Sequence, residues 1–267
     1  MKYFDKKNNR LVFENVKASA EFWDVHWNVA DFKNSILSGK NDRFVSKYTK
    51  KYIPPNRSKK ILEGGCGKGN FVYSLYHQGY DAYGIDYAEE TIKKINGSLP
   101  DLKISYGDVR NISYPDDFFD GYWSLGVIEH FFEGYDKIID EASRIIKKDG
   151  LFFVTFPNLS PLRKLKAFFS CYPKFNEETF NQELFYQFAL DSKSVQQAME
   201  KRGFSLVFRK PFDGTKGLKD EISFLKPLLQ KVYGSKNIIC RIISYAISMI
   251  SSFFAGHAIL LIFKKND

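Results

Sequence analysis

A short series of glycines after an apolar run constrains the fold of this chain more than any other feature. The run 60–62 leads into Glu63, and glycines follow at Gly65, Gly67 and Gly69. Alternating glycines allow the backbone to turn sharply and to approach a ligand, since no Cβ stands in the way. The helical pattern that begins near Phe71 directs its free N–H groups toward the same turn. The stretch therefore predicts strand, tight turn and helix, with a nucleotide-type site at the carboxyl end of the strand.

The spacing of the glycines narrows the class of ligand. A dinucleotide fingerprint would need glycine where Asn70 stands, so the spacing disfavours an NAD-type oxidoreductase. A phosphate-binding loop would need Ser or Thr where Gly69 stands. The remaining pattern, acidic-x-Gly-x-Gly-x-Gly from Glu63, resembles the glycine loop of class I S-adenosylmethionine-dependent methyltransferases of the small-molecule (UbiE/UbiG-like) type. The resemblance implies S-adenosylmethionine as the cofactor and a Rossmann-like, doubly wound α/β fold.

Strand and helix patterns alternate through five rounds over residues 61–158, in the order of the family's motifs. Asp86 follows the second strand, roughly 20 residues after the loop, where a carboxylate holds ribose hydroxyls in doubly wound folds. Its alternative role is to cap the next helix. In the family, the acid in the place of Asp108 accepts from the adenine amino group, and the N–H of the next residue, Val109, meets a ring nitrogen. The resemblance thus assigns these residues to the cofactor: Glu63, Gly65, Gly67, Gly69, Asp86, Tyr87, Asp108, Val109, Ser124 and Leu125.

Glu129 and His130 follow the fourth strand, where the resemblance places the methyl acceptor. A histidine titrates near neutral pH, so His130 is a candidate general base for a hydroxyl or amine, with activity falling on the acid side near roughly pH 6 to 7. Glu129 is a candidate to orient its partner. In the alternative, the pair begins the next helix and shapes the cofactor pocket. The stretch 124–127 departs from the Asn/Asp-Pro-Pro-aromatic motif of nucleobase methyltransferases, which disfavours a base-modifying function.

We expect one domain over residues 1–267, with a seven-stranded, mostly parallel sheet whose last strand, 257–263, is antiparallel. Its parts are N-terminal lid helices in 1–58, a cofactor-binding core in 59–158, an acceptor-side insertion in 159–190, and a C-terminal part in 191–267 with a helical insertion at about 218–254. The insertion at 159–190 is basic and aromatic, which suits an acidic, sugar-like or lipid-linked acceptor. For Trp23 and Trp27 in the lid, anchoring of the core is preferred over direct contact with the ligand.

Charge and cysteine usage bound the partners and the compartment. The net charge is +9, but Lys and Arg are spread along the whole chain, which favours a solvated basic surface over a nucleic-acid site. Cysteines at positions 66, 171 and 240 form neither a disulfide framework nor a C-x-x-C metal site, so we expect a reducing cytoplasm and no metal. Residues 1–10 lack the apolar core of a signal peptide.

Residues 242–263 contain no charged side chain and are in principle long enough to span a bilayer. We do not expect a span, because Gly256 and His257 divide the run into a helical part and a strand that the sheet requires. Peripheral membrane contact through about 218–254 stays open, since basic residues accompany the apolar positions there. These basic residues are Lys226, Lys231, Lys236 and Arg241.

Together these patterns predict an enzyme that moves a methyl group from S-adenosylmethionine to an oxygen or nitrogen nucleophile of a small-molecule, glycan or lipid-linked acceptor. Catalysis would come mainly from holding donor and acceptor in reactive geometry. The alternative is a non-catalytic S-adenosylmethionine-binding partner subunit. The sequence leaves the oligomeric state open.

Overall fold

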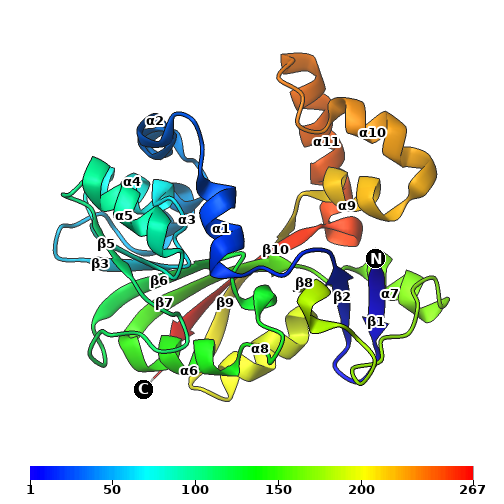
Figure 1. The fold of residues 1–267 in the computed structure, drawn as a ribbon, viewed down its shortest axis with the longest axis horizontal. Coiled ribbons are helices and arrows are strands. Elements are labelled where there is room, and N and C mark those ends of the chain that lie inside the picture. The colour runs from blue at the N-terminus through cyan, green and yellow to red at the C-terminus, as the bar shows by residue number, and fades with distance from the viewer. Residues whose placement is uncertain (267) are drawn as a thin grey trace.

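A seven-stranded sheet forms the centre of the protein (Figure 1). The computed structural model describes residues 1–266. In spatial order the strands are β5 (Lys103–Tyr106), β4 (Asp81–Asp86), β3 (Lys60–Gly64), β6 (Phe119–Leu125), β7 (Ile146–Pro157), β10 (Ala258–Lys265) and β9 (Phe204–Phe212). The first five run parallel, whereas β10 is antiparallel to both of its neighbours. The predicted doubly wound sheet with an antiparallel last strand is confirmed.

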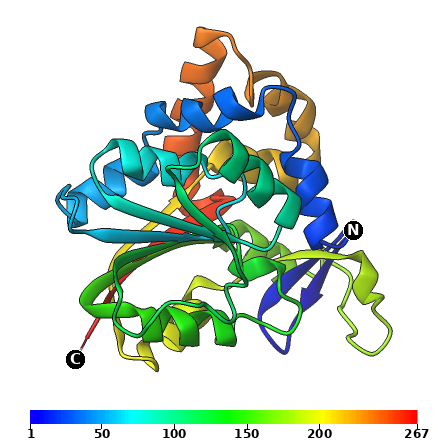
Figure 2. The same cartoon turned by 60° about the vertical axis from the view of Figure 1, so that its left-hand side comes forward.

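Helices cover both faces of this sheet, as Figure 2 shows. They are α1 (Ala20–Trp27), α2 (Phe32–Leu37), α3 (Val45–Tyr52), α4 (Asn70–His77), α5 (Glu89–Ser98), α6 (Asp136–Ile145), α7 (Pro161–Phe168), α8 (Ser192–Glu200), α9 (Gly214–Glu221), α10 (Lys226–Val232) and α11 (Ile238–Ala255). Short 3-10 turns are η1 (Ser38–Asn41), η2 (Ile128–His130), η3 (Gln182–Leu184) and η4 (Ser223–Leu225). Side chains of α6 and α8 join the core on one face, and those of α3, α4 and α5 join it on the other.

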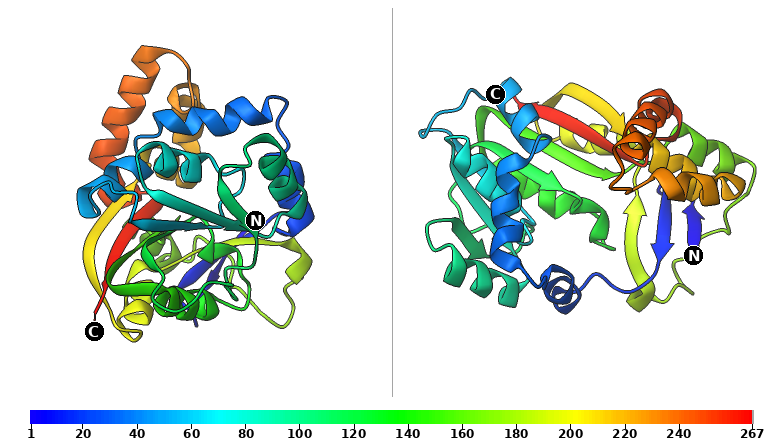
Figure 3. Two further views of the ribbon diagram at one scale, coloured as in Figure 1. Left: turned by 90° about the vertical axis from the view of Figure 1, so that its left-hand side faces the viewer. Right: turned by 90° about the horizontal axis from the view of Figure 1, so that it is seen from above.

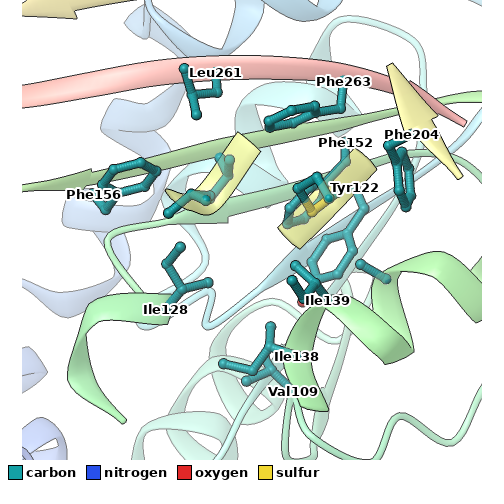
Figure 4. Packing of buried hydrophobic residues seen from close by; sticks show 14 of the residues in the cluster. Val109, Tyr122, Ile128, Ile138, Ile139, Phe152, Phe156, Phe204, Leu261 and Phe263 are labelled. Carbon is teal, nitrogen blue, oxygen red and sulfur yellow. The ribbon is translucent and has the colours of Figure 1, made fainter. Parts of the chain in front are cut away.

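The central strands are apolar at consecutive positions because both of their faces are buried. Tyr122 and Trp123 are neighbours in β6, yet Tyr122 packs under α6 and Trp123 packs on the opposite face with α3. Phe152 and Phe153 repeat this alternation in β7, and the rings of Trp123 and Phe153 stack with centroids 4.4 Å apart. Figure 4 shows the cluster that contains Tyr122 and Phe152, between the sheet and α6. The alternation follows from the two-residue period of a strand.

A second, three-stranded sheet was not predicted. It consists of β1 (Lys2–Asp5), β2 (Arg10–Glu14) and β8 (Phe185–Ala189), all antiparallel. The start of the chain, which we assigned to lid helices, is therefore a hairpin. Asp5 organises its turn by accepting from the backbone N–H of Asn8 at 3.1 Å and from Arg10 Nε at 2.9 Å. The lid helices begin only at α1, and the division into a single domain stays a prediction.

The fifth strand of the sequence follows α6 without a connecting loop. Helix α6 ends at Ile145 and β7 begins at Ile146, which pairs with Phe119. The register of β6 against β7 then shifts around a bulge in which Asp149 has a φ of 62°. Lys147 lies in this bulged segment and pairs with Asp120 at 3.0 Å, so its charge serves the sheet and not a helix end.

We predict that Phe152→Ala lowers the free energy of unfolding by about 3–5 kcal/mol, because Phe152 is fully buried and truncation leaves a cavity. The matched control is Phe253→Ala. That ring is 83% exposed, so the same substitution there is expected to change stability by less than about 0.5 kcal/mol. Urea denaturation followed by circular dichroism measures both, and equal losses would contradict the core assignment.

Candidate active site

The glycine loop after β3 has the backbone that the sequence predicted. The backbone φ angles of three loop glycines are positive: Gly65 at 72°, Gly67 at 49° and Gly69 at 77°. Residues other than glycine rarely adopt this region. The N–H groups of Gly65 and Cys66 both donate to the carbonyl of Ile85 at the end of β4, at 2.8 and 3.0 Å. The loop is therefore fixed to the neighbouring strand before α4 begins at Asn70.

Asp86, the last residue of β4, completes this connection. Its Oδ2 accepts from the N–H of Gly67 at 2.7 Å, and its Oδ1 accepts from the N–H of Ala88 at 2.9 Å. Burial raises the pKa of Asp86 above its usual value, although these N–H groups oppose the shift. Each carboxylate oxygen keeps lone-pair capacity for a ligand hydroxyl. The side chain thus holds the turn before α5, as the capping alternative proposed, and it also faces a cavity.

The cavity beside Asp86, here named the lid cavity, lies between the glycine loop and α1. Its wall includes Trp23 and Trp27 of the lid together with Gly65 and Asp86 of the core. A Cβ on Gly67 would lie 2.7 Å from the indole of Trp27, so the absence of that atom lets the lid pack directly on the loop. The cavity measures about 60 Å³, far below the roughly 300–1,000 Å³ of typical ligand pockets. The structure therefore shows a closed lid.

Polar contacts hold the lid in this position. Asp24 of α1 accepts from the backbone N–H and the hydroxyl of Thr91, at 2.8 and 2.7 Å, at the start of α5. The hydroxyl of Tyr87 donates to the carbonyl of Ala18 at 3.0 Å. None of the residues of α1 is buried. Because no side chain of α1 is fully buried and only a few hydrogen bonds fix the helix, we infer that it can open without disrupting the core.

A second cavity of about 220 Å³, here named the insertion cavity, adjoins the first and shares Tyr87, His130 and Phe131 with it. Gln182 and Phe185 bring the insertion 159–190 to its wall. Its further lining residues are Lys17, Ala18, Asp108, Arg110, Phe132 and Glu133. The insertion thus reaches the candidate site from the side that faces away from the glycine loop.

Asp108 lies in the insertion cavity with its carboxylate already paired. Arg110 Nη2 approaches Asp108 Oδ2 at 2.6 Å, and the backbone N–H of Arg110 donates to Oδ1 at 2.8 Å. Partial burial acts to raise the pKa of Asp108, but these bonds outweigh it and hold the pKa below its usual value. Asp108 is therefore an ionised acceptor at neutral pH. Its predicted contact with an adenine amino group would have to be shared with Arg110.

His130 lies where the two cavities meet. Its Nδ1 is 2.7 Å from the carbonyl oxygen of Tyr186 in β8. A carbonyl can only accept, so Nδ1 carries the proton and Nε2 keeps a free lone pair. Burial lowers the pKa of His130 to about 4, and the Tyr186 carbonyl only partly opposes this. The ring of Trp23 packs edge-on at 5.2 Å between centroids. His130 is thus a neutral hydrogen-bond acceptor at physiological pH.

Three carboxyl or hydroxyl groups behind the cavity walls lack partners within the described part of the chain. They are Glu63 Oε2, Ser124 Oγ and Glu129 Oε2. Burial raises the pKa of Glu129 to about 8, and burial together with the nearby Asp86 raises the pKa of Glu63 well above its usual value. Glu129 is therefore mostly protonated at neutral pH in this closed form. Unpartnered buried polar groups cost about 1–3 kcal/mol each, so a ligand that supplied partners for these oxygens would be bound more favourably.

The structure brings most of the predicted residues to one place. Those that line a cavity are Gly65, Asp86, Tyr87, Asp108, Leu125 and His130. Those that lie behind the walls in the described structure are Glu63, Gly67, Gly69, Val109, Ser124 and Glu129. The cofactor and catalytic roles of all twelve stay predictions. The preference for Trp23 and Trp27 as core anchors is not supported, because both rings are half-buried and line the lid cavity.

Sequence reasoning missed the contribution of Tyr186. Its backbone carbonyl lies 2.7 Å from His130 Nδ1, and its ring packs edge-on against the imidazole at 5.2 Å between centroids. Strand β8 carries Tyr186 there by pairing with β2. No side-chain pattern encodes such a contact. Arg110 and Gly126 were also missed as cavity-lining residues, although both directly follow motif residues in the sequence.

Two observations define the class of this protein. The sheet has its central glycine loop after β3, and the acid at the end of β4 contacts that loop, which is the arrangement of doubly wound folds that bind nucleoside-type ligands. Residues 62–154 match the family described as methyltransferase domain. This part of the chain is a class I S-adenosylmethionine-dependent methyltransferase domain, and S-adenosylmethionine is its cofactor.

The chain is similar in sequence to other methyltransferases over part of their length. A probable S-adenosylmethionine-dependent methyltransferase of Mycolicibacterium smegmatis is 29% identical over 37% of this chain, and the match covers 38% of that protein. A demethylmenaquinone methyltransferase of Geobacillus is 25% identical over 45% of this chain and 54% of its own length. This chain therefore matches well under two thirds of either relative.

Solved structures resemble the fold over nearly the whole chain. A putative methyltransferase of Haloferax volcanii, solved in complex with the Trm112 methyltransferase activator, has a TM-score of 0.59 at 13% identity, covering 95% of this chain and all of that one. The [4+2]-cyclase SpnF has a TM-score of 0.56 at 15% identity, covering 96% and 98%. The second likeness shows that the fold alone does not fix the reaction.

The residues at the site suit this cofactor. Glu63 is buried beside the glycine loop, and its unpartnered Oε2 offers an acceptor for an amino group, while Asp86 offers acceptors for hydroxyls. The loop offers no Gly-Lys-Ser/Thr element for a diphosphate. In its bound state S-adenosylmethionine supplies a methyl group already activated by a sulfonium.

We predict that Asp86→Ala weakens binding of S-adenosylhomocysteine by about 1.5–3 kcal/mol, the range for hydrogen bonds to a charged group, and that Asp108→Asn costs less. Asp86 also holds the Gly67 N–H, so the melting temperature is measured beside the calorimetric affinity. The wild-type chain is expected to bind S-adenosylmethionine and S-adenosylhomocysteine but neither NAD nor ATP. Normal binding by Asp86→Ala would move the ribose contact elsewhere, and tight NAD binding would refute the site.

Proposed function

We propose that this protein is an enzyme that transfers the methyl group of S-adenosylmethionine to an oxygen or nitrogen nucleophile of a small-molecule, glycan or lipid-linked acceptor. The observation that carries the proposal is the position of His130, whose unprotonated Nε2 belongs to a side chain shared by both cavities. The lid cavity, on one side of His130, is lined by Gly65 of the glycine loop and by Asp86. The insertion cavity, on the other side, is lined by residues of the insertion. Donor and acceptor would therefore meet at His130.

The chain's own residues would act mainly by positioning. His130 Nε2 would accept a hydrogen bond from the acceptor's O–H or N–H and take up its proton as the new bond to methyl forms. Its low pKa makes this a weak base, so orientation of the nucleophile's lone pair is the larger contribution. Trp23 and Trp27 would exclude water when the lid closes. Glu129, protonated and buried beneath the site, would support the position of its neighbour.

Two observations bear on the acceptor. Gln182 and Phe185 place the insertion 159–190 against the insertion cavity, whose wall also carries the cations of Lys17 and Arg110 and the carboxylates of Asp108 and Glu133. An acceptor with an apolar body and a polar group would suit this wall. Demethylmenaquinone is the acceptor named for several relatives, so it is the first compound to test.

The alternative is a cofactor-binding partner subunit without transfer activity. The Haloferax fold neighbour was solved with an activator protein, which makes an accessory partner a reasonable variable in any assay. A partner-subunit role would need neither the free Nε2 of His130 nor a second cavity beside it.

We predict that the purified protein transfers label from a methyl-deuterated donor to a component of cell extract, detected by mass spectrometry as a product heavier by the labelled methyl group. Addition of S-adenosylhomocysteine is expected to suppress the labelled product, since it would occupy the same site. Cofactor binding without any labelled product, with extract as the source of both acceptor and partners, would favour the partner-subunit alternative.

We predict that His130→Ala lowers the maximal rate about 100-fold or more and hardly changes cofactor affinity. His77→Ala is the matched control, because His77 lies in the last turn of α4 and lines neither of the two described cavities. Equal rates for His130→Ala and wild type would leave proximity alone as the mechanism.

The pH dependence provides a separate test. The sequence led us to expect an acid limb near pH 6 to 7, but burial moves it to about 4, where Nε2 would become protonated. Above about pH 8 Glu129 would ionise in a buried place without a partner for Oε2, so activity is expected to fall there too. Glu129→Gln keeps the shape and removes this titration, and it should therefore abolish the alkaline limb only. An acid limb at pH 6 to 7 would show that His130 is solvated during turnover.

A further inference from the structure

The side chains of α11 are distributed in the opposite way to those of a surface helix in a water-soluble protein, whose apolar residues face inward and whose polar residues face outward. The inward face of α11 consists mostly of small and polar side chains at helical spacing, with Ile247 as the one large apolar member: Cys240, Ser244, Ile247, Ser248, Ser251, Ser252 and Ala255. This face contacts α9, where the N–H of Gly214 donates to Ser248 Oγ at 3.0 Å and to Ser252 Oγ at 3.1 Å. A Cβ on Gly217 would collide with the carbonyl of Ala255. Serine and glycine contacts of this kind are typical of helix pairs in lipid.

The outward face of α11 carries the large apolar side chains. Its exposed residues are Ile238, Ile239, Ile242, Ile243, Tyr245, Met249, Ile250, Phe253 and Phe254. At 3.6 residues per turn they cover about half of the helix circumference, and no charged residue interrupts them. Ile250 and Phe253, near the middle of this arc, are 85% and 83% exposed. A soluble monomer rarely shows so continuous an apolar surface unless something covers it.

The charge around α11 has one sign. Residues 222–266 contain no Asp or Glu, whereas Lys226, Lys231, Lys236 and Arg241 are exposed and make no ion pair within the described chain. Lys226 and Lys231 belong to α10, which packs against α11, and Arg241 lies in the first turn of α11. Figure 1 and the left view of Figure 3 show α11 rising from the larger sheet beside α9 and α10. The side chains on its outward face are exposed within the described part of the chain.

We propose that the exposed face of α11 docks this protein on the surface of a bilayer that contains anionic lipids. The apolar arc would enter the boundary between headgroups and acyl chains, and the four cations beside it would contact the anionic headgroups. This inference goes beyond methyl transfer and does not depend on it. It would keep the catalytic domain at a membrane, where a lipid-linked acceptor resides.

A membrane span is less consistent with these contacts. Among the described residues α11 alone is long and apolar enough to cross a bilayer by length and composition. However, one whole side of it packs on α9, whose Lys216, Lys219 and Asp220 carry charge. A span would place these charges in hydrocarbon at high cost. A position parallel to the interface leaves α9 on the water side.

A second copy of the chain is also a poorer occupant than lipid. A symmetric contact between two α11 helices would bring the cations of both copies together. The segment 222–266 offers no carboxylate to neutralise them. Anionic headgroups supply that missing charge.

The test is co-sedimentation of the purified full chain with vesicles of phosphatidylcholine, alone or mixed with phosphatidylglycerol. Wild type is expected to sediment with the mixed vesicles and much less with phosphatidylcholine alone. Ile250→Asp is expected to weaken binding at least about tenfold, since burial of one isoleucine alone is worth that much. Val207→Asp is the matched control, because Val207 is an exposed apolar residue of β9 outside the α11 face. Replacing Lys231 and Lys236 by Gln should weaken binding to mixed vesicles roughly fivefold for each cation.

Several outcomes would overturn the proposal. Wild type that stays in solution with both kinds of vesicle would exclude docking, as would an Ile250→Asp variant that binds like wild type. A concentration-dependent dimer in sedimentation velocity that Ile250→Asp abolishes, without vesicle binding, would assign the face to a second copy. Protein that leaves cell membranes only with detergent and resists alkaline carbonate would indicate a span. None of these readouts uses catalysis, so failure of the proposed methyl transfer would be distinguishable.

Discussion

The hydrogen bond from the Gly67 N–H to Asp86 is the contact on which the candidate site depends. It joins the turn after β3 to the end of β4 at 2.7 Å, so that two consecutive strands set one binding surface. The bond is possible because glycines with positive φ expose backbone N–H groups that a side chain would cover. The position of the lid follows from the same turn, since Trp27 packs where Gly67 has no Cβ.

The closed site contains buried polar groups whose missing hydrogen bonds raise its free energy, and a ligand that supplies these bonds would lower it. Glu63 and Glu129 are buried without partners for one oxygen each, and burial raises the pKa of both carboxyl groups. His130 is kept neutral by burial, and its tautomer is set by a carbonyl from the small sheet. The few polar contacts of Asp24 hold the lid over this region. The arrangement favours a lid that opens for the cofactor and closes over the acceptor.

The C-terminal helices show a different balance of forces. In the core, apolar side chains face inward on both sides of the sheet, as Tyr122 and Trp123 illustrate. In α11 the serines face inward, and all of the isoleucines except Ile247 face outward. In both cases apolar side chains are removed from water if the surroundings of α11 are apolar. A single chain can thus be built for water around its sheet and for lipid along one helix.

The sequence by itself determined the sheet, the glycine loop and the family, because short-range periodicity and the conformational freedom of glycine are local properties that residues 59–158 display in order. It also located Asp86, Asp108 and His130 near one another, since parallel strands end at a common edge. Only the tertiary structure decided the hairpin at the start of the chain, the Tyr186 carbonyl on His130 and the outward face of α11. These features arise from contacts between segments distant in sequence, and a backbone carbonyl or the direction in which a helix turns its apolar side leaves no local signature.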